Sequence, residues 1–107
     1  GGTATITWQS NTVITFNDLA LTEQMLPSLE ASAGKDNVYL VKATTGGEDF
    51  SYFQEVVPGF YFFLGGMTPG NKESFPHHTP DFMIDDSSML LGVNVFCQLT
   101  IDYLNAN

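Results

Sequence analysis

Two short segments carry the side chains whose types could do chemistry, and one of them is a pair of histidines. His77 and His78 are the only histidines in the sequence, and they precede Thr79–Pro80 within a long loop rich in glycine and proline. Imidazole is a common ligand for zinc, manganese, iron, copper and nickel, and a Thr-Pro turn would hold the ring rigidly. Adjacent histidines in a loop are also often ordinary surface residues, and a catalytic zinc site needs about three protein ligands. The pair alone is therefore a weak indication of a metal site.

The other segment is a glycine-rich turn, Gly46–Phe50, which places two carboxylates between an expected strand and an expected helix. In one interpretation Asp49 caps the helix and Glu48 is solvated. In the other, the two carboxylates lie at the carboxyl end of a parallel strand, where open α/β sheets place their sites. The turn has no lysine and its carboxylates would repel a phosphate, so it is not a phosphate-binding loop.

The elements that must position these segments follow from the apolar pattern. The expected strands are 3–8, 13–16, 38–41 and 60–64, and the expected helices are 19–33, 49–57 and about 85–105. Because strands and helices alternate after Asn17, we predict an α/β fold with a helix-covered, mainly parallel sheet. Segment 60–64 is apolar on both faces, which predicts a central buried strand. We also expect most of the last helix to be buried.

Composition limits the classes of partner. The 107 residues carry a net charge of −9, with three lysines, no arginine and a hydrophobic share of 43%. Three scattered lysines exclude nucleic acid and an anionic membrane surface as partners, and no apolar stretch is long enough to span a membrane. Cys97 is the only cysteine and is expected to be a buried, inert thiol. No signal peptide is visible, so the sequence leaves a cytoplasmic or a periplasmic location open, and the missing initiator methionine suggests a piece of a longer chain.

Taken in order, these segments resemble the C-terminal portion of the metal-dependent amidohydrolases and aminoacylase-like metallopeptidases. That family includes hippurate hydrolases, N-acyl-amino-acid deacylases and indole-acetyl-amino-acid hydrolases. The matching motifs are Gly46–Ser51, Pro58–Gly65, His78–Phe82, Ile84–Asp86 and Asp102–Leu104. Each motif is short, but the ordered set is specific and covers nearly the whole chain. Gly47 stands where the family usually has Ala or Ser, and Thr79 stands where it usually has Ser or Asn.

The resemblance implies different roles for the residues of the two segments. His78 matches the family's last metal ligand, and Gly47, Glu48 and His77 would bind substrate or support the ligands. In the intact enzyme two divalent ions, zinc or manganese, would activate a water that attacks the amide carbonyl of an N-acyl amino acid. The family's general base and other ligands precede this segment, so the resemblance implies no catalytic base here. The isolated segment is expected to be inactive.

The resemblance also implies a fold and a set of partners. Residues 17–107 would be the C-terminal part of a zinc-peptidase-like catalytic domain, and residues 1–16 the last strand of a lid, or dimerisation, domain. The partners would be the N-acyl amino acid substrate, the rest of the parent chain and a second copy in a homodimer. The alternative, from another class, is a small acidic binding or interaction module in which the His-Thr-Pro loop is incidental.

Overall fold

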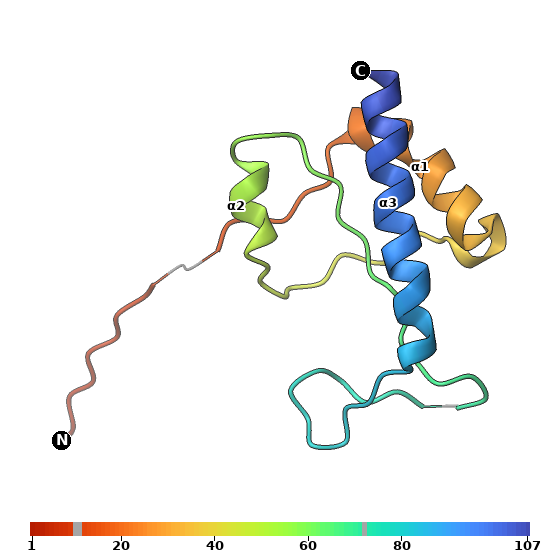
Figure 1. The fold of residues 1–107 in the computed structure, drawn as a ribbon. Helices are drawn as coiled ribbons and strands as arrows, with labels where there is room; N and C mark the ends of the chain where they lie inside the picture. Colours follow the sequence, from red (N-terminus) through yellow and green to blue (C-terminus); the bar gives the residue numbers. More distant parts are fainter. Residues whose placement is uncertain (10–11, 72) are drawn as a thin grey trace.

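The computed structural model describes residues 1–9, 12–71 and 73–107 of the chain. Its elements, in chain order, are α1 (Leu19–Ala33), the 3₁₀ turn η1 (Lys35–Asn37), α2 (Phe50–Gln54), the 3₁₀ turn η2 (Asp86–Ser88) and α3 (Met89–Ala106). No strand is assigned within the described residues, and the segments expected as strands run as unpaired chain (Figure 1). A strand needs a hydrogen-bonded neighbour, and these segments do not supply one to each other. The α/β sheet therefore stays a prediction.

Helix α1 begins and ends where its sequence predicts. The Asp18 carboxylate accepts a hydrogen bond from the backbone N–H of Leu21 at 2.8 Å, which satisfies one of the free donors of the first turn. Gly34 ends the helix at φ 84°, a left-handed conformation that glycine adopts without strain, and its N–H donates to the carbonyl of Glu30 at 2.8 Å. The helix continues through Pro27.

Helices α1 and α3 lie side by side and form the main core of the described chain (Figure 1). Met25 and Leu29 of α1 and Val95 of α3 are its buried apolar side chains. The chain at 60–64 also crosses α3. A Cβ on Gly92 would lie 2.9 Å from the Leu64 side chain, so a small residue lets this segment approach.

The expectation that most of α3 is buried is wrong for the described chain. Only Gly92 and Val95 of this helix are buried, whereas Phe96 is 64% exposed. Cys97, expected to be buried, is exposed as well. The reason is that, among the described residues, α1 covers one stripe of α3 and the 60–64 segment crosses it only near Gly92 and Phe96, which leaves the remaining surface exposed. Its apolar pattern is that of a helix buried on more than one side.

The chain as a whole is also less compact than a typical folded protein of its size. Its accessible surface is 9199 Å², compared with about 5,900 Å² for a compact folded protein of 11.7 kDa. The radius of gyration is 17.7 Å, where a compact chain of this length has about 13 Å. Residues 1–9 extend away from the helices (Figure 1), and segment 60–64, expected to be interior, leaves Phe63 58% exposed. None of the described helices is long and apolar enough to cross a bilayer.

Candidate functional site

The His-Thr-Pro segment forms a tight turn. The Thr79 hydroxyl donates a hydrogen bond to the carbonyl of Pro76 at 2.8 Å, and the Phe82 N–H donates to the carbonyl of Thr79 at 3.2 Å. Within this turn His78 has a φ of 65°, which is uncommon for a residue other than glycine. Such conformations cost about 1–3 kcal/mol and gather at functional sites. The strain falls on His78, the residue that the sequence resemblance predicts as a metal ligand.

The two histidines differ in their surroundings although both are exposed. The His77 ring packs edge-on against Phe82, with centroids 4.7 Å apart and an interplanar angle of 69°. The His77 and His78 rings are 6.4 Å apart, at 77°. His77 therefore helps to hold the turn together, and the turn presents the His78 imidazole to solvent.

The glycine-rich turn lies against the N-terminal segment. A Cβ on Gly47 would approach the Thr12 hydroxyl oxygen to 3.0 Å, so a larger residue there would push Thr12 aside. Glu48 is half-buried and lies near the Tyr61 phenol. Burial of the phenol and then the negative charges of Glu48 and Asp49 raise the pKa of Tyr61 above its usual 10.0. The Tyr61 phenol therefore stays protonated at neutral pH.

Asp49 stands at the N-cap position of α2, but the expectation that its side chain caps this helix is wrong. Its backbone is already helical, with φ −71° and ψ −17°, and its carboxylate makes no capping hydrogen bond. A capping side chain normally needs an extended backbone at that position. Ser51, fully buried, instead donates its hydroxyl to the carbonyl of Glu48 at 2.6 Å. Helix α2 is also shorter than the predicted 49–57.

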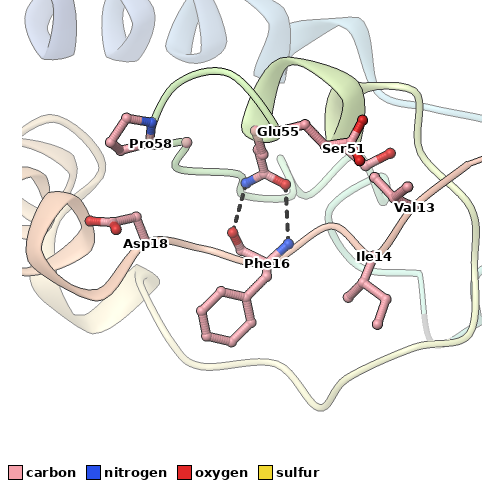
Figure 2. Close-up of a pocket in the computed structure, with 9 residues that line it drawn as sticks. Val13, Ile14, Phe16, Asp18, Ser51, Glu55 and Pro58 are labelled. Atoms are coloured by element: carbon pink, nitrogen blue, oxygen red, sulfur yellow. Dashed lines mark hydrogen bonds between the residues drawn. The ribbon is translucent and has the colours of Figure 1, made fainter.

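Two amide side chains join the N-terminal segment to α2 and to the chain beyond it. Gln54 accepts from the Phe16 N–H at 3.0 Å and donates to the Phe16 carbonyl at 2.9 Å, the two dashed bonds in Figure 2. Asn17 does the same for Tyr61, at 2.8 and 2.7 Å. Each side-chain amide thus pairs with both the backbone N–H and the carbonyl of one residue, as the backbone of a neighbouring strand does in a sheet. Sequence analysis missed both residues because nothing in an isolated Gln or Asn indicates its partner.

A pocket of about 200 Å³ opens along this junction (Figure 2). Apolar side chains and two carboxylates line it, among them Val13, Ile14, Phe16, Asp18 and Glu55. None of the four residues proposed for the site from the sequence lines this pocket. One oxygen of the Asp18 carboxylate accepts the hydrogen bond that caps α1.

The structure does not bring the two predicted segments together. The loop that contains His77 and His78 lies at one end of α3, away from α2 and the glycine-rich turn that precedes it (Figure 1). Within residues 1–9, 12–71 and 73–107, no group of three or more His, Cys, Asp or Glu side chains could hold a metal ion. A metal site at His78 therefore stays a prediction.

Comparison with known proteins gives a consistent result. The model of peptidase family M20/M25/M40 matches residues 2–102. Thermostable carboxypeptidase 2 of Saccharolobus solfataricus is 30% identical over 86% of this chain and 23% of its own length. The putative amidohydrolase YhaA of Bacillus subtilis is 27% identical over 96% of this chain and 26% of its own. The IAA-amino acid hydrolase ILR1-like 6 of Arabidopsis thaliana is 31% identical over 67% and 16%.

The chain spans about a quarter or less of the length of these relatives. No solved structure gives a significant match.

Proposed function

Because the chain belongs to peptidase family M20/M25/M40, we propose that it is the C-terminal segment of a metal-dependent hydrolase that cleaves the amide bond of N-acyl amino acids or related amides. The observation that carries this proposal is the family match over residues 2–102, which includes both segments singled out for chemistry. Relatives named as an amidohydrolase and as an IAA-amino acid hydrolase support an amide of an amino acid as the substrate. Membership of a hydrolase family favours this function over an acidic binding module.

His78 is the residue of this chain that would hold a metal. This residue is exposed on a hydrogen-bonded turn, and imidazole is a ligand that suits zinc. It fits as one member of a ligand set, and the rest of the parent chain would supply the others. Two divalent ions bound there would supply a water activated for attack on the amide carbonyl.

The other three residues proposed for the site, His77, Gly47 and Glu48, would lie near this metal centre. His77 holds the turn through its contact with Phe82 and would line the mouth of the site. Gly47 and Glu48 would reach the substrate or the outer side of the metal ligands once the rest of the parent chain brings the glycine-rich turn and the histidine turn to one cleft. Glu48 is suited to accept a hydrogen bond from a substrate N–H, because an ionised carboxylate is an acceptor at both oxygens.

The uncovered apolar surface supports the rest of the parent chain as a partner. Phe96, Cys97, Thr100 and Ile101 line an apolar hollow of about 330 Å³ on the outer stripe of α3. Contiguous apolar surface of this kind marks an interface. In the parent enzyme we propose that other segments cover α3 and pair with 38–41 and 60–64 as a sheet, while residues 1–16 end the lid domain through which two copies pair.

Hydrolysis by the full-length parent enzyme tests the proposal. The enzyme is purified, stripped with a chelator, and reloaded with zinc or manganese, and release of the amino acid from N-acetyl and N-benzoyl amino acids is measured. We expect activity that is lost on stripping and returns with metal. The isolated 107-residue chain, assayed in parallel, should give no turnover. A metal-loaded parent that hydrolyses none of these amides would overturn the proposal.

A further inference from the structure

Among the described residues, five hydrogen bonds attach residues 16–18 to the end of α2 and to the segment that follows it. Four of them come from the side-chain amides of Asn17 and Gln54. The fifth joins the Asp18 N–H to the Gly59 carbonyl at 3.0 Å. The residues that the two amides join are 38 and 44 positions apart in the sequence. Residues 16–18 and their partners therefore form an anchor between two distant parts of the chain.

A glycine makes room for this anchor. Gly59 is buried, and a Cβ at this position would lie 2.5 Å from Cγ and 2.8 Å from Nε2 of Gln54. Any larger residue would therefore displace the Gln54 amide from its two hydrogen bonds. Gly59 does not have the left-handed backbone that favours glycine, so its role here is steric. The Pro58–Gly59 motif, to which the sequence analysis assigned no role, is thus explained by the space that Gln54 needs.

The anchor holds the N-terminal segment through its main chain rather than through its side chains. The Phe16 ring is 72% exposed and points away from the two dashed bonds in Figure 2, and Ile14 is 84% exposed. The Gln54 amide nevertheless satisfies both backbone polar groups of Phe16. Residues 1–9 extend away from the helices (Figure 1). The anchor is therefore a fixed point between the extended N-terminal chain and the helices.

We propose that Asn17, Gln54 and Gly59 set the direction in which the N-terminal segment leaves the helices, and that they thereby position the lid domain relative to the site. The effect on the lid rests on the proposed function, in which residues 1–16 end that domain, whereas the anchor itself does not. Without the anchor the lid would take several orientations. If a fraction of these can bind substrate, the apparent dissociation constant rises by the inverse of that fraction. Asn17 and Gln54 are therefore positioning residues for substrate binding.

The anchor is tested first in the 107-residue chain. Hydrogen exchange of the Phe16 N–H is measured by NMR in the unchanged chain, in Gln54→Met, which removes the amide, and in Gly59→Ala, which fills its space. Exchange should become about tenfold faster in both variants, the effect of losing one hydrogen bond. Gln98→Met, where the amide bonds within α3, and Gly65→Ala, where a Cβ meets nothing within 4 Å, are the matched controls and should leave it unchanged. An unchanged Phe16 exchange rate in Gln54→Met would overturn the proposal.

The consequence for substrate binding is tested in the full-length enzyme. Gln54→Met and Gly59→Ala should each raise KM for an N-acyl amino acid about three- to tenfold and change kcat less than about twofold, because saturating substrate selects the productive orientation. Asn17→Asp keeps the acceptor and loses the donor, so its rise in KM should be smaller. A lower kcat with unchanged KM would mean a merely structural role and would refute the positioning role. A parent without amide hydrolysis would refute the proposed function, while the exchange result still decides the anchor.

Discussion

The α1–α3 pair and the segments that carry the family motifs differ in how much of their surroundings this chain supplies. The helix pair brings its own cap at Asp18, its own stop at Gly34 and a small shared core around Val95. The motif segments have local turns and ring contacts, but their predicted strands have no partners in the described residues and their site residues lie apart. Helix formation needs neighbours three or four residues away, whereas a sheet and a metal centre need residues far away in the sequence. A chain a quarter the length of its relatives can therefore form helices before it can form a site.

This difference is tested most strongly at the two histidines. In the full-length enzyme His78→Ala should remove bound metal, because the site would lose one of its ligands. Hydrolysis of an N-acyl amino acid should fall by at least about 100-fold as a result. The melting temperature of the isolated chain should stay the same, since His78 packs on nothing that supports the helices. Metal content by elemental analysis, kcat/KM and thermal melting are the measurements.

His77→Ala is the matched control for that experiment. It removes a ring contact with Phe82 and leaves the proposed ligand in place, so metal should remain bound and the activity should fall only modestly. Undiminished metal in His78→Ala, or equal loss in the two variants, would show that the turn has no ligand at His78.

The helix pair should show the opposite response. Val95 is 1% exposed at the contact with α1, and Val95→Ala should lower the free energy of unfolding of the isolated chain by about 2 kcal/mol through the cavity it leaves. Val93→Ala, on the exposed stripe of the same helix, should change it by less than about 0.5 kcal/mol. Urea unfolding followed by circular dichroism measures both. Equal effects at the two positions would mean that the α1–α3 contact is not the core of the isolated chain.

The same difference explains how far the sequence could predict this structure. The start and end of α1 are encoded by residues within it or next to it, and they lie where the pattern places them. The exposure of most of α3 and the missing cap by Asp49 were not predictable, because burial depends on what covers a helix and capping depends on the backbone angle at one residue. The junction of Asn17 and Tyr61 joins residues 44 positions apart, and no local pattern indicates it.

Within the candidate site, the sequence could locate the residues but not their geometry. The family motifs identify His78 and Glu48 as residues of interest, and the family match confirms the resemblance on which that choice rests. The left-handed backbone of His78 and the packing of Tyr61 against Phe50 depend on the surrounding turn and on neighbouring rings, which a motif does not specify. Their assembly into one metal site remains a prediction.

The smallest expected effect separates two aspartates that look alike in the sequence, each standing before a helix. Asp18 accepts a hydrogen bond from the Leu21 N–H, so Asp18→Ala should lower the stability of the isolated chain by about 1 kcal/mol, and Asp18→Asn, which keeps an acceptor, should restore most of it. Asp49 makes no capping bond to α2, so Asp49→Ala should change the stability by less than about 0.5 kcal/mol. Urea unfolding of the three variants side by side resolves differences of this size. A loss in Asp49→Ala as large as that in Asp18→Ala would mean that α2 is capped in solution and that the glycine-rich turn supplies its own helix start, as α1 does.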